Sequence, residues 1–382
     1  MRRAREARGE RLPWTLVKTI SAVPTVVCGS QVEGRETMAT AIKKRPTIND
    51  VARNAGVSIK TVSRVFNNEP NVRPATRDRV VAAAGDLGYR PNLSARRLAA
   101  NRTFVIGMLY DNPKAPDYVA DVQYGALGVC RARGFDLLIH PCDGQSPTLV
   151  DEILDLHQQA TVDGFVVLQP VSDQQRLNQA LLDHGIVSVR VSQRGFAGLP
   201  RISVCDQEAA DEMTEHLVEL GHRRIGFIMG HPDHGSSHDR LAGYRSALAR
   251  HGIEFDETLV EHGLYDYESG YACAHRMLDL RPRPTAIFAS NDHMAMATLT
   301  AAHERRLEIP HDLSVAGFDD TAFAGFAWPP LTTVRQPVVE VAKLATSLLL
   351  DRLQGRTKDF PDQRLRAEIV YRASTGRAAE TG

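Results

Sequence analysis

The 382-residue chain lacks long apolar runs and has few cysteines. None of its hydrophobic stretches approaches the roughly 18 residues that a membrane-spanning helix requires, so we expect no membrane partner. The five cysteines form no C-x-x-C pair and their number is odd, which disfavours a disulfide framework and a zinc ribbon. These absences favour a protein of the reducing cytoplasm.

Motifs of catalysis are also missing. The sequence contains no G-x-S-x-G, H-E-x-x-H, P-loop or G-x-G-x-x-G motif. His231, His234 and His238 have a spacing that could suit a metal, but their Gly-, Ser- and Asp-rich stretch is predicted to be a loop. Asp319 and Asp320 are adjacent, so on one strand their side chains would point to opposite faces, which disfavours a catalytic pair. We therefore expect that the protein is not an enzyme and that it has no cofactor and no metal site.

Residues 1–45 show no sustained helical or strand period, and we expect them to form a disordered extension. Their Arg-rich start and the run LPWTLVKTISAVPTVVCGS resemble an export signal, but Lys18 and Pro24 interrupt the apolar stretch. Met38 lies just before ATAIKKRP, where ordered sequence begins, and is therefore an alternative first residue.

The net charge of zero conceals a division along the chain. Residues 41–100 hold 12 basic and 4 acidic side chains, whereas the 282 residues after them hold 27 basic and 38 acidic ones. Hydrophobic residues make up 43% and charged residues 24%, as in ordinary globular domains. The division predicts a small polyanion-binding head on a larger acidic body with another task.

The basic region has the pattern of three short helices. Apolar residues recur at helical spacing after Thr47, and Gly56 can end the first helix in a tight turn. Ser58 is a good N-cap for a second helix over Ile59–Phe66, and a third is predicted over residues 75–87. Two short helices joined by a Gly turn and supported by a third indicate a helix-turn-helix unit.

The outer face of the second predicted helix is suited to DNA. It combines hydroxyls, cations and one apolar tip, which can bind phosphates and reach base edges in a major groove. Its residues are Ile59, Lys60, Thr61, Ser63 and Arg64. A three-helix adaptor that binds protein is the alternative, and the concentrated basic charge disfavours it.

The head resembles the DNA-binding head of the LacI/GalR transcriptional regulators. The resemblance is carried by GVS-x-x-TVSRV, TR-x-RV, GYRPN and SARRLA, and it extends from about Pro46 to Arg372. It implies that residues 46–90 bind double-stranded operator DNA, with Ile59, Lys60 and Arg64 as the principal base readers. It implies phosphate contacts for a further set: Thr47, Ser58, Thr61, Ser63, Asn67 and Thr76.

The same resemblance implies a hinge helix and linker over residues 91–102. Leu98 would insert into the minor groove and kink the duplex, with Arg96 beside it. A segment this short is not stable as an isolated helix, so its ordering on DNA is physically reasonable.

From Thr103 onward, short apolar runs alternate with longer amphipathic ones. A first series of strands is predicted over residues 104–110, 135–142, 164–170 and 186–191. A second series is predicted over residues 201–206, 224–230, 286–290 and 314–319. Helices are predicted over residues 117–133, 207–220, 240–251 and 269–280. This alternation predicts an α/β body of two lobes with parallel sheets below a small all-α head.

The body, residues 103–372, resembles a periplasmic-binding-protein fold that binds an effector and dimerises. The resemblance places lobe 1 at about 103–201 and 333–372 and lobe 2 at about 202–332, with a tail over 373–382. Ligands in such sheets bind beyond the carboxyl ends of the strands, here in the cleft between the lobes.

Several cleft residues follow from matched motifs. Arg240 in RLAG, Asn291 in SND and Asp319 in GFDD stand where family members hydrogen-bond an effector, often a sugar. Helix capping or bonding between elements is the alternative role for these three. The resemblance implies that Tyr265 stacks on the ligand and that Asp117 and Tyr118 line the cleft from lobe 1. Further candidates are Ser192, which falls at the pocket, and His234 and Ser236, which lie just before Arg240. Ser192-Gln193 replaces the Asp-Arg pair of many members, so the effector cannot be copied from one relative.

The expected function is a cytoplasmic repressor of carbohydrate-utilisation genes that binds a palindromic operator as a homodimer. A small molecule in the cleft, in the first instance a sugar, would control that binding through the distance between the two hinges. Residues 123–130 are a candidate dimer contact. Two alternatives stay open: the effector is not a sugar but, for example, a nucleobase, or the regulator activates transcription. A solute-binding receptor, the alternative from another class, would need an export signal and no basic head.

Overall fold

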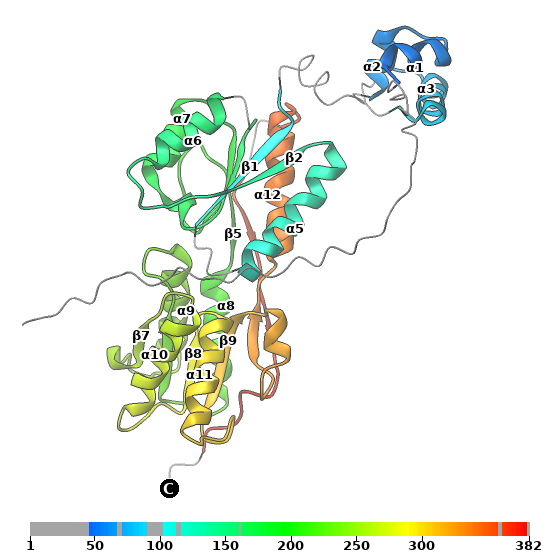
Figure 1. Ribbon diagram of the computed structural model, residues 1–382. Coiled ribbons are helices and arrows are strands. Elements are labelled where there is room, and N and C mark those ends of the chain that lie inside the picture. Colours follow the sequence, from blue (N-terminus) through cyan, green and yellow to red (C-terminus); the bar gives the residue numbers. More distant parts are fainter. Residues whose placement is uncertain are drawn as a thin grey trace, which may run out of the picture. The chain divides into compact units, whose positions relative to one another are not determined.

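The computed structural model describes residues 46–66, 71–89, 102–111, 116–159, 162–357 and 361–379. They belong to two compact units, which divide between Pro91 and Asn92 (Figure 1). In this described part of the chain, no helix combines the length and the apolar character needed to span a bilayer.

The described residues of unit 1 form a bundle of three helices. They are α1 (Ile48–Ala55), α2 (Ile59–Phe66) and α3 (Pro74–Leu87). Gly56 ends α1 at φ 60°, and the Thr61 amide donates to the Ser58 side chain at 3.1 Å, so the predicted turn and N-cap are confirmed. The apolar faces of the helices meet in one small core: Val51, Ala52, Ala55, Val62, Val65, Val80, Ala83 and Ala84.

Unit 2 contains two six-stranded sheets, each the centre of one lobe. The lobe 1 sheet has the order β11-β5-β4-β3-β1-β2, and the lobe 2 sheet has the order β12-β10-β9-β8-β6-β7. The lobe 1 strands are β1 (Val105–Tyr110), β2 (Asp136–Pro141), β3 (Phe165–Val167), β4 (Ser188–Val191), β5 (Arg201–Val204) and β11 (Gln363–Leu365). The lobe 2 strands are β6 (Ile225–Met229), β7 (Val260–His262), β8 (Ala286–Ala289), β9 (Ser314–Asp319), β10 (Thr332–Arg335) and β12 (Glu368–Val370).

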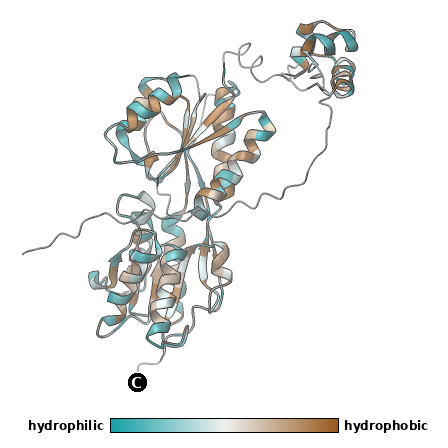
Figure 2. Cartoon of the chain, viewed as in Figure 1, coloured by the Kyte–Doolittle hydropathy of each residue, from teal (hydrophilic) through white to brown (hydrophobic). Residues whose placement is uncertain are grey.

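Helices cover both faces of each sheet, and the hydropathy colouring shows apolar strands between half-polar helices (Figure 2). In lobe 1, α5 (Pro116–Arg133) and α12 (Val338–Leu353) pack on one face, and α6 (Leu149–Gln158) and α7 (Gln175–Asp183) on the other. In lobe 2, one face is covered by α8 (Asp206–Glu219) and α9 (Gly235–Arg250), and the other by α10 (Tyr267–Asp279) and α11 (Asp292–Glu304). Short 3-10 turns lie at Val171–Asp173, Glu257–Leu259 and Ala322–Gly325.

Two details of the predicted lobes are wrong. Residues 201–206 are predicted in the second series, but β5 pairs with β4 and β11 in the lobe 1 sheet. Residues 333–372 are all predicted in lobe 1, but β10 pairs with β9 and β12 pairs antiparallel with β10, both in lobe 2. The hydrophobic pattern of a strand indicates which of its residues are buried but not which strand it pairs with. In addition, β12 has only three residues, too few for a clear pattern.

Residues 373–379, expected to be a separate tail, are bonded to lobe 2 in the structure. The Ser374 hydroxyl donates to the Val315 carbonyl at 2.6 Å, and the Ala378 amide donates to the Leu220 carbonyl at 2.9 Å. Buried His222 bonds both Ser314 and the Gly376 carbonyl at 3.0 Å. The segment therefore closes the end of the lobe 2 sheet.

Candidate functional site

A cleft with about 800 Å³ of space, its open mouth included, lies between the lobes. Most of the predicted effector residues line it: Tyr118, Ser192, His234, Ser236, Arg240, Tyr265, Asn291 and Asp319. Gln193, which differs with Ser192 from the expected family pair, also lines the cleft. Further lining residues outside the list of predicted effector residues include Tyr110, Asp111, Gln169, Asp206 and Gln336. Parallel strands of both sheets, among them β3, β4, β9 and β10, end at this cleft, as the topology predicts.

Arg240 and Asp206 form a buried ion pair in the lobe 2 wall. The Arg240 Nε donates to Asp206 Oδ1 at 2.7 Å, and its Nη1 donates to the Ser290 carbonyl. The guanidinium also lies 3.6 Å from the centre of the Phe318 ring. Burial opposes the charge, but the Asp206 carboxylate outweighs it and holds the pKa of Arg240 above its ordinary value. The position of Arg240 in the cleft is thus fixed before any effector binds.

Tyr265 stands in the same wall in a strained backbone conformation, with φ 64°. Its hydroxyl bonds Ser237 at 2.8 Å and Ser236 at 3.2 Å, both in the first turn of α9. A Cβ atom on Gly230 would lie 2.0 Å from the Tyr265 Cζ, so only glycine leaves room for the ring. The ring is therefore held by hydroxyls at one end and by backbone at its face.

Asn291 is the N-cap of α11, and its amide is engaged within the protein. Its Oδ1 accepts from the Met294 amide at 2.9 Å, and its Nδ2 donates to the Tyr265 carbonyl at 2.8 Å. Helix capping, the alternative role expected for Asn291 from the sequence, is thus present in the structure. Asn291 still lines the cleft, where its second amide hydrogen can reach a ligand.

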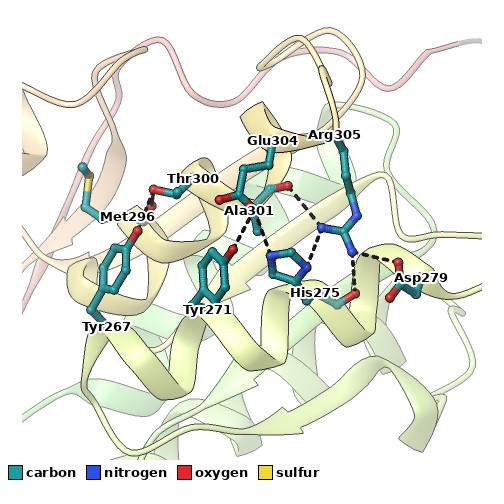
Figure 3. Close-up of polar contacts among 9 residues, drawn as sticks. All are labelled: Tyr267, Tyr271, His275, Asp279, Met296, Thr300, Ala301, Glu304 and Arg305. Atoms are coloured by element: carbon teal, nitrogen blue, oxygen red, sulfur yellow. Dashed lines mark hydrogen bonds and ion pairs between the residues drawn. The ribbon is translucent and has the colours of Figure 1, made fainter.

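A ladder of side chains ties α10 to α11, the helix that Asn291 caps (Figure 3). The Tyr267 hydroxyl donates to Thr300 at 2.9 Å, and the Tyr271 hydroxyl donates to Glu304 at 2.7 Å. Arg305 donates to His275 Nδ1 at 2.7 Å. Because arginine has no acceptor, Nδ1 must carry no proton, and His275 Nε2 donates to Glu304. The ladder thus joins α10 and α11 on one face of the lobe 2 sheet.

Asp319 ends β9 with φ 119°, a conformation that most side chains avoid. Its Oδ1 accepts from Gln336 Nε2 at 2.6 Å. Burial raises the pKa of Asp319 to about 7, Arg240 opposes that rise, and Asp292 adds to it. The neighbouring Asp320 instead binds Arg335 and Arg372, so the two adjacent carboxylates serve different partners.

Part of the lobe 1 wall is the loop after β4. The Ser192 hydroxyl donates to Asp173 Oδ1 at 2.5 Å, which fixes the start of that loop. Gln193 Nε2 donates to the Val204 carbonyl at 3.0 Å and also to Asp206, across to the start of lobe 2. Gln193 thus binds the carboxylate that also holds Arg240.

Two predicted features of the cleft differ in the structure. Asp117 does not line the cleft but pairs with His293 of α11 at 3.5 Å, because it precedes the inward-facing Tyr118 at the start of α5. His238 lies in the first turn of α9 and not in a loop, since that helix begins at Gly235. No group of three or more His, Cys, Asp or Glu within the described ranges could hold a metal ion.

The outward surface of α2 carries the predicted DNA contacts of unit 1. Ser58, Ile59 and Lys60 are exposed, and Ile59 is 50% exposed although it is a large apolar residue. Thr61, Ser63, Arg64 and Thr76 are half-buried. The amide and the hydroxyl of Thr47 donate to Asp50 at 2.9 and 2.7 Å, so Thr47 caps α1. The predicted contacts Asn67, Arg96 and Leu98 lie outside the described residues.

Comparison with known families agrees with both units. A family model described as bacterial regulatory proteins, lacI family, matches residues 47–92. A model described as periplasmic binding protein-like domain matches residues 214–375. The HTH-type transcriptional regulator CelR of Thermobifida fusca is 35% identical over 339 residues, which span 87% of this chain and 99% of that protein. The chain belongs to the lacI family. It is a DNA-binding transcriptional regulator and not an enzyme.

Solved structures of lacI-family regulators share the fold. A complex of the regulator CelR with cellobiose is 32% identical, with a TM-score of 0.66 over 86% of this chain and all of that one. A lac repressor dimer bound to operator and an anti-inducer is 29% identical, with a TM-score of 0.67 over 87% of this chain and all of that one. The helix-turn-helix head and the two-lobed body are therefore confirmed.

Proposed function

We propose that this lacI-family regulator represses its target genes from the cytoplasm. Residues 46–90 bind a palindromic operator as part of a homodimer, and a neutral sugar in the cleft controls that binding. Base reading by Ile59, Lys60 and Arg64 and the hinge role of residues 91–102 with Leu98 are part of this proposal. The bound cellobiose and the operator-bound dimer of the similar structures support it.

The chemistry of the cleft supports a neutral, polyhydroxylated effector. Three carboxylates, Asp111, Asp206 and Asp319, line it together with Arg240, whose charge Asp206 already neutralises. Burial lowers the pKa of His234 to about 4, so this imidazole carries no charge near pH 7. A phosphorylated sugar would meet net negative charge, whereas sugar hydroxyls can donate to these carboxylates. This charge balance is the observation that carries the effector class.

Exposed aromatic side chains on lobe 2 support the homodimer. Phe326 is 88% exposed and Trp328 is 81% exposed, next to the 3-10 turn at Ala322–Gly325. Adjacent large apolar side chains on a surface mark an interaction site. Since a palindromic operator is bound by a symmetric dimer, the partner at this site is a second copy of the chain with the same patch. In lobe 1, exposed Tyr124 lies within the candidate contact 123–130. Sedimentation velocity should show Trp328→Ser as a monomer, with Tyr371→Ser, 63% exposed, as the control.

The experiment selects duplexes from a random library with the purified full-length chain and then adds ligands one at a time. We expect enrichment of a palindrome, and we expect cellobiose or another neutral sugar to change its affinity. Glucose 6-phosphate serves as the anionic arm and a nucleobase as the non-sugar arm. No enrichment of any duplex would overturn the proposal, and a response to the phosphorylated sugar alone would overturn the effector class.

A further inference from the structure

Asp163 binds the segment that joins the body to the DNA-binding head. Its Oδ1 accepts from the amide and the hydroxyl of Thr103, each at 2.9 Å, and its Oδ2 accepts from the Phe104 amide at 2.9 Å. The Asp163 amide in turn donates to the Val105 carbonyl at 2.7 Å. One carboxylate therefore satisfies three donors at the point where the linker, residues 91–102, ends.

The backbone at this point has an unusual shape. Phe104 has φ 55°, which a bulky side chain adopts only where its surroundings impose it. Its carbonyl accepts from the Asp136 amide at 2.8 Å, and its ring packs edge-on against Phe135 at 5.3 Å between centres. The carboxylate and the ring together set the direction in which the chain leaves the lobe 1 sheet.

Asp163 lies two residues before β3, and the other end of β3 reaches the cleft. Phe165, Val166 and Val167 are fully buried between β1 and β4. Leu168 and Gln169, directly after them, line the cleft. A three-residue strand spans about 10 Å and cannot stretch, so displacement of its cleft end moves its Asp163 end.

We propose that Asp163 is a positioning residue for operator binding: it clamps Thr103 and Phe104 and so fixes the exit of the linker relative to lobe 1. This inference rests on the proposed function, because it assigns a role within operator binding. It predicts that operator affinity depends on a carboxylate that lies in the body rather than in the head. Without the clamp, the linker has more conformations to lose when both heads bind one operator.

Three variants of the full-length chain test the clamp. Asp163→Ala removes all three bonds, whereas Asp163→Asn keeps an acceptor for Thr103 but cannot accept from the Phe104 amide at its nitrogen. Asp151→Ala, an exposed carboxylate in the first turn of α6, is the control because it removes the same charge from the same lobe. Each variant is titrated with the selected palindrome and with a scrambled duplex, and its amide hydrogen exchange is followed over residues 103–105.

We expect Asp163→Ala to lower affinity for the palindrome by about tenfold, a typical size for coupling between distant sites. Asp163→Asn should fall between it and the wild type. Affinity for the scrambled duplex should stay within about twofold of the wild type, because the basic head supplies it. Exchange at residues 103–105 should accelerate in Asp163→Ala and stay unchanged in Asp151→Ala.

Wild-type affinity of Asp163→Ala for the palindrome would overturn the inference, and faster exchange alongside it would show a clamp with a purely structural role. Equal exchange rates at residues 103–105 in the wild type and all variants would show that Asp163 does not clamp this segment. This measurement needs no DNA, so it tests the clamp in the free protein. If the wild type selects no duplex at all, the proposed function fails, which is a different result from a variant-specific loss.

Discussion

The two walls of the cleft are built differently. In lobe 2, Arg240, Tyr265 and Asn291 are buried and bonded to protein partners before an effector arrives. In lobe 1, Ser192 and Gln193 lie in the loop after β4, where they bond to Asp173 and Asp206. The lobe 2 wall is thus a rigid template of buried side chains, whereas this part of the lobe 1 wall is a loop. We expect lobe 2 to fix how an effector lies and lobe 1 to select which effector it is.

The largest effect is expected from Arg240→Ala, which leaves Asp206 buried without its cation. Breaking one partner of a buried ion pair costs about 3–5 kcal/mol of unfolding free energy. The Arg240→Ala/Asp206→Ala double variant should lose less than the two single variants together, measured by urea denaturation. Arg364→Ala, in the exposed pair with Glu208, is the control and should cost about 0–1 kcal/mol. A cost for Arg240→Ala as small as that of the control would refute a rigid template.

Gly230→Ala should be next in size, since the new methyl group overlaps the Tyr265 ring. Overpacking of this kind costs about 1–3 kcal/mol and would displace the ring from the cleft. Calorimetric titration with cellobiose, or with the strongest ligand of the sugar screen, should show a large loss of affinity. Gly195→Ala in the lobe 1 loop is the control, because the nearest atom to its methyl group would be 3.9 Å away. An unchanged titration would mean that the position of the ring is unimportant.

Asp319 should make effector affinity depend on pH. With its pKa near 7, Asp319 is partly protonated at neutral pH in the free cleft, and its ionised form is the stronger acceptor for sugar hydroxyls. Affinity should therefore rise between about pH 6 and pH 8, by up to about tenfold if binding requires the carboxylate. Asp319→Asn should bind more weakly and show no such rise. A wild-type affinity that falls over this range would reverse the sign and exclude this role.

The smallest effect is expected from Asp117→Asn. Because Asp117 pairs with His293 outside the cleft, effector affinity should change by less than about twofold. Ser192→Ala, which removes the hydroxyl that holds Asp173, should change it more. If Asp117→Asn has the larger effect in the same titration, Asp117 reaches the effector in the bound state.

Much of this fold could be predicted because its signals are local. Ser58 could be assigned as an N-cap from its place before an apolar helix, and the structure shows the bond to Thr61. Arg240, Asn291 and Asp319 stand in motifs, and all three line one cleft. The partners of these residues could not be predicted, because pairing depends on distant segments that the fold brings together.

Asp206 shows both the omission and the signal that was available. It lies two residues after the end of β5, and its carboxylate is the partner of Arg240, 34 positions later in the chain. A polar residue at the carboxyl end of a predicted parallel strand lies at the edge where ligands bind, so this position marked Asp206 as a candidate. None of the motifs that carry the resemblance contains Asp206, so the resemblance alone does not indicate it.

The chain passes from one lobe to the other at three places within the described residues: after β5, after β10 and after β11. Asp206 follows the first passage and Gln336 the second, and both line the cleft. Two of the three connections therefore carry a cleft-lining side chain, so a ligand bound in the cleft would contact the segments that join the lobes. Any change that such a ligand makes in these segments would act on both lobes at once.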